Sequence, residues 1–322
     1  MEILIKKLKE YKKNIKIMEV CGTHTSVIHK NGIRDLISKN IQLVSGPGCP
    51  VCVTKAGYVD RLVQLSEEYT ILTFGDMVKV RGSEKSLENV KNKIILYNPL
   101  EAVAIARENP DKKYCFAAVG FETTLPIYAL ILEDCPKNLK LLTSLKAIIP
   151  AVEYICNTDN EINAFLAPGN VCAIIGSKPF EYIVKKYKKP IIVTGFTPEH
   201  ILMSIYSALK MVENADFTVK NLYKNIVKEN GNEKALALIN KHFTLTNDWW
   251  RGLGIIENSA YTFDNEYIPD TEEKSRGCCC AEIILGKKMP KDCPLFKKTC
   301  TPFNPIGACM VGNEGVCKIM YS

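Results

Sequence analysis

The sequence lacks several features that would assign it to a common functional class. It has no apolar run of the roughly 18 residues that a membrane span requires. Neither G-x-x-x-x-G-K-[ST] nor G-x-G-x-x-G occurs, so direct sequence evidence for nucleotide binding is absent. Arginine is scarce, with 6 Arg against 36 Lys. Because proteins that bind bases or phosphates bidentately depend on arginine, the net charge of +7 indicates a solvated lysine-rich surface rather than nucleic-acid binding.

The first residues also lack the uninterrupted apolar segment of a secretory signal. Residues 1–16 alternate apolar side chains with Lys and Glu. We therefore expect a cytoplasmic protein with no membrane partner and no nucleic-acid partner. The length of 322 residues, 47% of them hydrophobic, is sufficient for about two domains with packed cores.

Cysteine is the residue that the sequence has in excess, with 14 in all. In a reducing compartment, so many thiols indicate metal, cluster or redox chemistry. Seven lie within residues 278–317, and three more are in glycine-rich turns near the start. The other four lie among apolar residues and are interpreted as buried, inert thiols. These four are Cys115, Cys135, Cys156 and Cys172.

The Cys-rich segment has six regularly placed thiols and one extra, Cys279. The six are Cys278, Cys280, Cys293, Cys300, Cys309 and Cys317. A zinc ribbon would need two C-x₂-C pairs, which are missing, and six thiols exceed the four of a tetrahedral zinc. An iron–sulfur cluster takes four thiolates and leaves two that could form a redox-active disulfide beside it. Zinc and plain disulfides are the alternatives.

Cys49-Pro50-Val51-Cys52 forms a C-x-x-C motif in a glycine-rich turn. Such a pair is either a dithiol/disulfide couple or half of a metal site, and a helix N-terminus there would favour the thiolate. Cys21 follows another apolar run. If the two runs are neighbouring strands, the three thiols would meet and would suit a metal such as iron. The alternative is three unrelated thiols.

Two further polar residues lie in turns where a site is expected. His24 is three residues after Cys21 and is a candidate functional histidine. The alternative is a turn histidine whose hydrogen bonds are satisfied. Glu122 follows an apolar run and is a candidate charge partner or proton acceptor.

Short apolar runs that end in glycine-containing turns recur along the chain and alternate with helical stretches. They cover residues 15–20, 41–45, 69–74, 114–119, 171–175 and 191–194. Apolar strands alternating with helices are typical of parallel sheets buried on both faces. Ligands of such folds bind at the carboxyl ends of the strands, so a site is expected in the residues after each run.

The predicted fold class is therefore α/β, with two parallel-sheet α/β domains and a Cys-rich C-terminal iron–sulfur domain. The expected segments are 1–110, which contains the N-terminal thiols, then 111–240, and finally 241–322. The last segment has little periodicity and is expected to fold around an inorganic group.

Seven motifs, in order over essentially the whole chain, resemble the signatures of the HypD family of [NiFe]-hydrogenase maturation factors. They are Cys21-Gly22-Thr23-His24-Thr25, Gly46-Pro47-Gly48-Cys49-Pro50-Val51-Cys52, Phe74-Gly75-Asp76-Met77, Gly120-Phe121-Glu122-Thr123-Thr124, Phe165-Leu166-Ala167-Pro168-Gly169, Trp250-Arg251-Gly252-Leu253-Gly254 and Cys300-Thr301-Pro302 through Cys309-Met310-Val311. The sequence departs from the pattern at Asn170, where the family has His, and at Cys279 and Ala281.

The resemblance implies a scaffold for assembling the Fe(CN)₂CO group rather than a conventional turnover enzyme. A HypC-like chaperone would share a mononuclear iron with this chain, a HypE-like protein would donate cyanide, and the loaded iron would pass to the hydrogenase large subunit. The implied iron ligands are Cys21, Cys49 and Cys52.

The resemblance also implies roles for the C-terminal thiols. The ligands of a [4Fe–4S] cluster would be Cys278, Cys293, Cys300 and Cys317. Cys280 and Cys309 would form a disulfide pair that, with the cluster, carries electrons toward Cys49 and Cys52. The alternative functions are an iron–sulfur thiol–disulfide oxidoreductase and a structural zinc protein.

Overall fold

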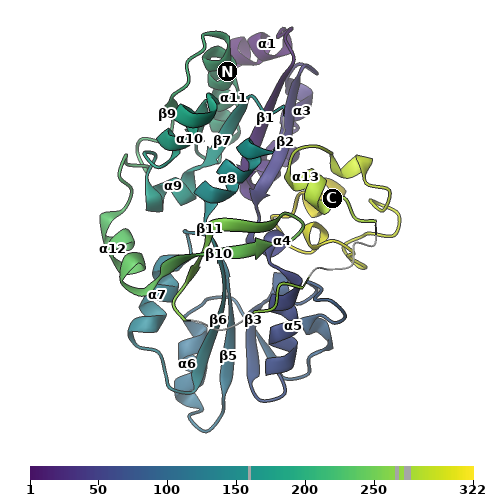
Figure 1. Cartoon of the computed structure of the whole chain (residues 1–322). Coiled ribbons are helices and arrows are strands. Elements are labelled where there is room, and N and C mark those ends of the chain that lie inside the picture. The colour runs from purple at the N-terminus through teal and green to yellow at the C-terminus, as the bar shows by residue number, and fades with distance from the viewer. Residues whose placement is uncertain (159–160, 265–267, 272–276) are drawn as a thin grey trace.

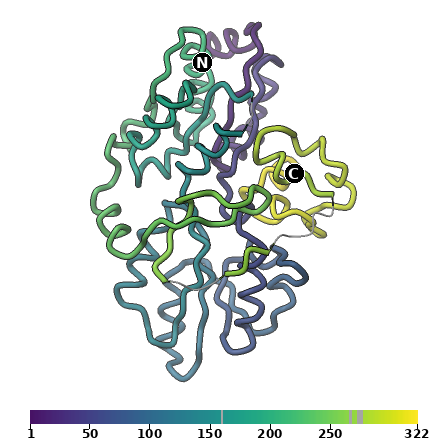
Figure 2. Tube along the Cα trace, in the orientation of Figure 1, coloured from purple at the N-terminus to yellow at the C-terminus, as the bar shows by residue number. Residues whose placement is uncertain are grey.

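The computed structural model describes residues 1–158, 161–264, 268–271 and 277–322. Two β-sheets lie one above the other in Figure 1, and the Cys-rich C-terminal segment, drawn in yellow, lies beside the junction between them. The Cα trace shows the same arrangement, with the C-terminus close to this junction and the N-terminus at the far end of the upper sheet (Figure 2). The α/β class expected from the sequence is confirmed.

Sheet A is parallel throughout and has five strands in the order β2-β1-β7-β8-β9. Its strands are β1 (Ile15–Cys21), β2 (Ile41–Gly48), β7 (Ala164–Pro168), β8 (Ile191–Thr194) and β9 (Val219–Asn221).

Sheet B is mixed and has six strands in the order β10-β11-β6-β5-β3-β4. Four are parallel, and the β10–β11 hairpin is added antiparallel to β6. Its strands are β3 (Thr70–Phe74), β4 (Lys93–Leu96), β5 (Tyr114–Gly120), β6 (Leu139–Lys146), β10 (Thr244–Trp250) and β11 (Gly254–Thr262).

Each sheet takes strands from both sides of the boundary that the sequence predicts near residue 110. In sheet A, β1 pairs with β7, and in sheet B, β3 pairs with β5. The hairpin that joins sheet B comes from the segment 241–322. The predicted segments therefore do not each correspond to one sheet.

Helices cover the outer faces of both sheets and connect them (Figure 1). In the first half of the chain they are α1 (Glu2–Lys9), α2 (Gly22–Lys30), α3 (Ile33–Leu36), α4 (Pro50–Val53), α5 (Ala56–Leu65), the 3₁₀ turns η1 (Gly75–Met77) and η2 (Leu87–Asn89), α6 (Glu101–Glu108), α7 (Leu125–Glu133) and α8 (Ile148–Asn157). They continue with α9 (Gly169–Ile175), α10 (Phe180–Tyr187), α11 (Pro198–Glu213), α12 (Glu233–His242), α13 (Cys280–Ile284), η3 (Pro290–Asp292), η4 (Ala308–Met310) and α14 (Val316–Tyr321). None of the helices in the described ranges has the length and apolar character needed to span a bilayer.

The apolar runs form strands because both of their faces are buried. In β1, Ile15 and Ile17 pack under α1 and α11, whereas Met18 and Val20 face a core shared by both sheets and the C-terminal segment. Since successive side chains of a strand point to opposite faces, a continuous apolar run fits a sheet that is covered on both sides. The shared core explains why the Cys-rich segment packs firmly although it has little regular structure.

One expected strand is wrong. Residues 171–175 belong to the helix α9, which starts at Gly169 and is followed by Gly176 with φ of 84°. The strand at this place is β7, which lies just before the helix. Short apolar runs do not distinguish a strand from a buried helical turn, and here the Pro168-Gly169 step starts the helix.

The four scattered thiols are only partly as expected. Cys115 and Cys172 are buried, but Cys135 and Cys156 are half-buried at the ends of helices. Burial raises the pKa of Cys156 to about 11, which fits an unreactive thiol.

Candidate thiol and metal site

The carboxyl ends of strands from both sheets line one cleft of about 920 Å³. Pro50 and Val51 follow β2 of sheet A, and Gly75 and Asp76 follow β3 of sheet B. The C-terminal segment closes another side of the cleft with Val311 and Lys318. The cleft thus lies where the parallel-sheet rule predicts a site, and it adjoins the C-x-x-C motif.

Cys21 and the C-x-x-C motif are brought together by the pairing of β1 with β2. The register places Cys21 opposite Gly48, the residue before Cys49. A Cβ on Gly48 would lie only 1.7 Å from the carbonyl oxygen of Val20, so no other residue allows this approach. The expectation that the two strands are neighbours is confirmed.

Cys21 ends β1 and immediately precedes α2. Burial, and after it the negative charge of Glu314, raises the pKa of the Cys21 thiol to about 11. The backbone N–H groups of Thr23 and His24 act in the opposite direction, because they donate hydrogen bonds to the sulfur. The site therefore has donors for a thiolate but keeps the free thiol protonated at neutral pH.

Cys49 and Cys52 are joined by a disulfide across the single turn of α4. Their Cα atoms are 5.3 Å apart, and the backbone N–H of Cys52 donates to Cys49 Sγ at 3.2 Å. Within the described ranges, no three His, Cys, Asp or Glu side chains form a group that could hold a metal ion as they stand. A site built from all three N-terminal thiols requires this disulfide to be reduced first.

The C-terminal segment lies directly on the N-terminal thiols. Cys52 Sγ is 4.0 Å from the carbonyl oxygen of Ala308, the residue before Cys309. A Cβ on Gly312 would lie 3.2 Å from Cys49 Sγ. The backbone of Ala308 and Gly312 therefore packs against the C-x-x-C disulfide.

Two carboxylates that the sequence analysis did not assign to the site lie in succession from Cys21: the charge of Glu314 acts on Cys21, and that of Asp76 acts on Glu314. Glu314 accepts a 2.7 Å hydrogen bond from Thr23 Oγ1. Burial raises the pKa of Glu314, and the charge of Asp76 raises it further. Burial likewise raises the pKa of Asp76, which the ammonium of Lys318 opposes. Glu314 is isolated in a loop of the sequence, and only the fold shows that it reaches α2.

The C-terminal thiols gather into one group. Cys278, Cys280 and Cys309 are linked by hydrogen bonds from thiol to thiol. Burial raises the pKa of the Cys317 thiol, and interactions with other thiols of the group raise it further. Those thiols include Cys278, Cys293 and Cys300. Cys279, the extra thiol, is hydrogen-bonded to Cys293.

His24 does not direct its ring toward the thiols. The ring stacks on Phe196 with centroids 4.7 Å apart, at the carboxyl end of β8. Neither ring nitrogen makes a well-formed hydrogen bond. The backbone of Gly195 and Thr194 lies close enough to raise the pKa of the imidazole slightly, against the lowering by burial. Burial lowers the pKa of His24 to about 4. The imidazole of His24 is therefore buried and neutral, and His24 contacts Cys21 through its backbone N–H rather than through the ring.

Glu122 is buried between the two sheets. Its Oε1 accepts a 2.8 Å hydrogen bond from the backbone N–H of Ile148 at the start of α8, and its Oε2 has no partner in the described structure. Burial raises the pKa of Glu122 to about 7, against the effect of this hydrogen bond. Glu122 can therefore exchange a proton near neutral pH, but its observed contact is with a helix end.

The chain is similar to known proteins over nearly its whole length. The HypD family model, described as hydrogenase formation hypA family, matches residues 1–322. A putative hydrogenase expression/formation protein of Methanocaldococcus jannaschii is 40% identical over 338 residues, covering 98% of this chain and 94% of that protein. The hydrogenase maturation factor HypD of Escherichia coli is 36% identical over 330 residues, covering 95% and 88%. HypD of Azotobacter vinelandii is 34% identical over 341 residues, covering 97% and 90%. With a family match along its whole length and relatives above 30% identity over nearly all of it, the chain belongs to the HypD family.

Proposed function

We propose that this chain is the scaffold on which the Fe(CN)₂CO group of [NiFe] hydrogenase is assembled. Membership of the HypD family supports a role in hydrogenase maturation. The observation that carries the finer proposal is the register that sets Cys21 opposite Gly48, directly beside the C-x-x-C disulfide. Three thiols at one sheet edge, next to a cleft, offer soft ligands to an iron that is to be modified and passed on.

The iron is the cargo of this scaffold, and its site forms only after reduction. Breaking the Cys49–Cys52 bond takes two electrons and two protons and leaves two thiols. Ionised, they add two thiolates to that of Cys21. The backbone N–H donors at the start of α2 favour a thiolate at Cys21, which a bound cation would further stabilise.

The group of C-terminal thiols fits a [4Fe–4S] cluster. Cys317 interacts electrostatically with Cys280 and, after it, with Cys278, Cys300 and Cys293, the three other thiols of the proposed ligand set. A four-iron cluster holds its thiolates farther apart than a single ion does, so a loose group of four thiols suits it better than zinc. When bound, the cluster would supply single electrons to the neighbouring thiols.

The chain's own thiols would deliver two electrons to the C-x-x-C motif. The Cys280 and Cys309 thiols are hydrogen-bonded to each other, and Cys309 follows Ala308, which contacts Cys52. A Cys309 thiolate that attacks Cys52 Sγ releases Cys49 as a thiolate, and Cys280 then attacks Cys309 and releases Cys52. The result is a Cys280–Cys309 disulfide and a reduced C-x-x-C pair.

We further propose that a HypC-like chaperone completes the iron site and that a HypE-like protein donates cyanide. The open cleft beside Val51 and Asp76 offers access to the thiols from outside. The hydrogenase large subunit would receive the finished group through the chaperone.

A second function, thiol–disulfide oxidoreductase with an iron–sulfur cluster, is favoured by the same Cys52–Ala308 contact. The oxidoreductase would turn over external disulfides and would need no additional iron. The two proposals therefore differ in metal stoichiometry and in the requirement for a chaperone.

The deciding experiment is metal analysis of oxygen-free protein, alone and with a HypC-like partner. We expect about four irons and four sulfides per chain, plus one further iron in the complex with the partner. Cys21→Ala should lose only that further iron, with its cyanide and carbonyl infrared bands, whereas Cys115→Ala, a buried thiol in β5, should retain it. A complex without additional iron would favour the oxidoreductase. Zinc without sulfide would exclude the cluster.

A further inference from the structure

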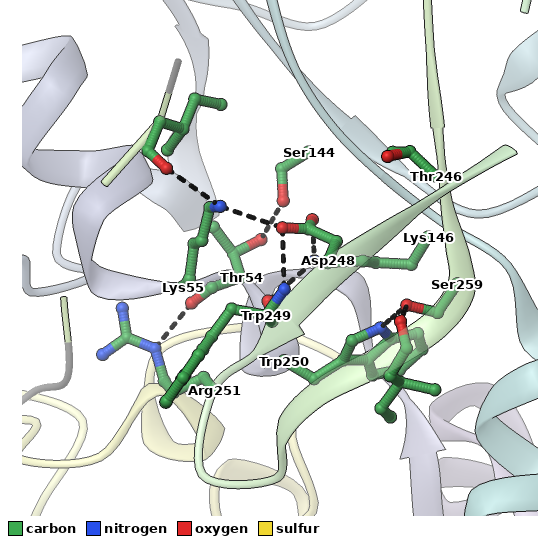
Figure 3. Close-up of polar contacts among 12 residues, drawn as sticks. Thr54, Lys55, Ser144, Lys146, Thr246, Asp248, Trp249, Trp250, Arg251 and Ser259 are labelled. Carbon is green, nitrogen blue, oxygen red and sulfur yellow. Dashed lines mark hydrogen bonds and ion pairs between the residues drawn. The ribbon is translucent and has the colours of Figure 1, made fainter. Parts of the chain in front are cut away.

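The turn of the β10–β11 hairpin reaches from sheet B to the helix that carries the C-x-x-C motif (Figure 3). The backbone N–H of Arg251 donates to the carbonyl oxygen of Val53 at 3.0 Å. Its guanidinium Nε donates to the carbonyl oxygen of Thr54 at 2.6 Å, and Nη2 donates to that of Arg81 at 2.7 Å. Val53 and Thr54 are the end of α4, one and two residues after Cys52. Arg251, only 8% exposed, therefore holds this short helix through its backbone.

The same turn touches the C-terminal thiol group. A Cβ on Gly252, whose φ is +75°, would lie 2.9 Å from the Cβ of Ala281, the neighbour of Cys280. The positive charge of Arg251 also acts on Cys309, where it favours the thiolate. Arg251 is thus a common neighbour of the N-terminal and the C-terminal thiol pairs, and it belongs to neither.

The hairpin is anchored firmly enough to act as a support. Asp248 pairs with Lys55 at 2.9 Å and also with Lys146, which is fully buried. The indole N–H of Trp250 donates to Ser259 Oγ at 2.8 Å across the hairpin. Buried charges persist only where they are paired, so the ion pairs of Asp248 fix β10, the strand that immediately precedes Arg251.

We propose that Arg251 is a positioning residue that holds the end of α4 so that Cys52 stays within reach of Cys309. This inference rests on the proposed electron transfer from Cys280 and Cys309 to the Cys49–Cys52 disulfide. Without the guanidinium, the two hydrogen bonds to the end of α4 become one and the bond to Arg81 is lost, and α4 has only a single turn of its own to resist displacement. Loss of Arg251 should therefore slow the exchange without removing any sulfur that takes part in it.

The test uses the oxidised full-length protein and one equivalent of dithiothreitol under anaerobic conditions. Samples are quenched with an alkylating reagent at intervals, and peptide mass spectrometry gives the reduced fraction of each thiol pair. Cys280 is partly exposed whereas Cys49 and Cys52 are buried, so we expect dithiothreitol to reduce the Cys280–Cys309 pair first and the Cys49–Cys52 pair to follow by internal exchange. The Cys280→Ser variant gives the rate at which dithiothreitol reduces Cys49–Cys52 when internal exchange cannot be completed.

We expect Arg251→Met to slow the reduction of Cys49–Cys52 by about tenfold or more, toward the rate of Cys280→Ser, because displacement by about 1 Å is costly for such a step. Arg251→Lys keeps the charge and one donor and should be intermediate. Ser259→Ala is the matched control, since it removes the Trp250 hydrogen bond of the same hairpin but no contact with α4. Melting temperatures of all variants show whether each is folded.

Two outcomes would overturn the inference. In the first, Cys49–Cys52 is reduced slowly in Cys280→Ser, but in Arg251→Met and Arg251→Lys it is reduced as fast as in Ser259→Ala. Arg251 then does not position Cys52 for the exchange. If Cys280→Ser is as fast as the unmodified protein, internal exchange itself is absent, and the proposed electron transfer fails together with the role of Arg251.

Discussion

The hydroxyl of Thr23 donates a 2.7 Å hydrogen bond to the carboxylate of Glu314, which lies 291 residues later in the chain. This contact closes the C-terminal segment over the start of α2, immediately after Cys21. Cys21 and the Cys-rich segment therefore form one continuous site. Any chemistry at the N-terminal thiols takes place against the backbone of the C-terminal segment.

Neutralising Glu314 is expected to make the Cys21 thiol more acidic. After burial, the charge of Glu314 is the next cause that raises the pKa of Cys21 to about 11. Removing a nearby like charge lowers a thiol pKa by up to about one unit, so alkylation of Cys21 near pH 9 should be about threefold to tenfold faster in Glu314→Gln. Peptide mass spectrometry after timed iodoacetamide quenches measures the rate.

Glu233→Gln provides the control, because Glu233 is an exposed carboxylate in the first turn of α12. Its Cys21 alkylation rate should equal that of the unmodified protein. Equal rates in Glu314→Gln and Glu233→Gln would show that Glu314 does not influence the thiol.

Glu122 should make the protein less stable as the pH rises. Its pKa is raised from 4.5 to about 7 in the folded state, so the folded protein binds the proton more tightly than the unfolded chain. The stability from this group is complete below pH 4.5 and is lost as the pH rises to about 7. The total is about 3 kcal/mol at about 1.4 kcal/mol per pKa unit. Urea unfolding of Glu122→Gln across this range should lack that decline.

His24 should make the protein more stable as the pH rises, over a pH range that overlaps the range of Glu122. Its folded pKa is lowered from 6.5 to about 4, so its contribution is complete above pH 6.5 and is lost as the pH falls toward 4. The unmodified protein should therefore show a shallow pH profile. Glu122→Gln should become more stable with rising pH, and His24→Phe should become less stable. Identical profiles for the two variants would contradict both assignments.

The sequence predicts β1, β2, β3, β5 and β8 from their apolar runs, but it misses β6 and β7, although β7 is buried at every residue. The expected runs at 41–45 and 191–194 correspond to β2 and β8, which begin at the same residues. β10 and β11 were not predicted, because most of their residues are exposed or half-buried and give no continuous apolar run. The run at 171–175 was assigned to a strand because length and hydrophobicity alone do not exclude a helical turn.

Local sequence patterns do not predict which strands share a sheet or which distant residues come into contact. The pairing of β1 with β7 joins residues about 150 positions apart in sequence, and no local signal specifies it. The proximity of Cys21 to Cys49 was predicted only on the condition that their two runs are neighbouring parallel strands, which the pairing of β1 with β2 fulfils. Glu314 and Arg251 were not assigned to the site, because their contacts depend on how three distant segments pack together.

Gly22 should be intolerant of even a methyl group. A Cβ there would lie 2.3 Å from the carbonyl oxygen of Glu314 and 2.5 Å from its Cβ, so Gly22→Ala must push the C-terminal segment off α2. In a Cys280→Ser background, which lacks internal exchange, we expect dithiothreitol to reduce the Cys49–Cys52 disulfide about tenfold faster, because the disulfide loses its cover. Gly75→Ala is the control, since its Cβ would meet only Ile95 at 3.8 Å. If both variants are reduced at the same rate, the C-terminal segment does not shield the disulfide.

Asp248 pairs with Lys55 and Lys146 in the hairpin, and we expect loss of Asp248 to lower the free energy of unfolding more than loss of Lys146. Asp248→Asn leaves the fully buried Lys146 ammonium without its carboxylate, which should cost about 3 kcal/mol or more of unfolding free energy. Lys146→Met leaves Asp248 paired with Lys55 and fills the same space, so about 1 kcal/mol is expected. Glu213→Gln, which breaks a solvent-screened surface pair with Lys210 on α11, should leave the free energy of unfolding almost unchanged.

The pH dependence of the unfolding free energy should show whether Asp248→Asn destabilises the protein through an unpaired charge or through lost packing. Burial, with the charge of Lys55, already lowers the pKa of Lys146 against the attraction of Asp248. Without Asp248 the folded pKa falls further below that of the unfolded chain, so the destabilisation in Asp248→Asn should shrink as the pH rises toward 10.5. Lys146→Met has no such group and should show no recovery. Urea unfolding near pH 7 and near pH 9.5 makes the comparison. A constant deficit in Asp248→Asn at both values would mean that lost packing, not an unpaired ammonium, is the cause.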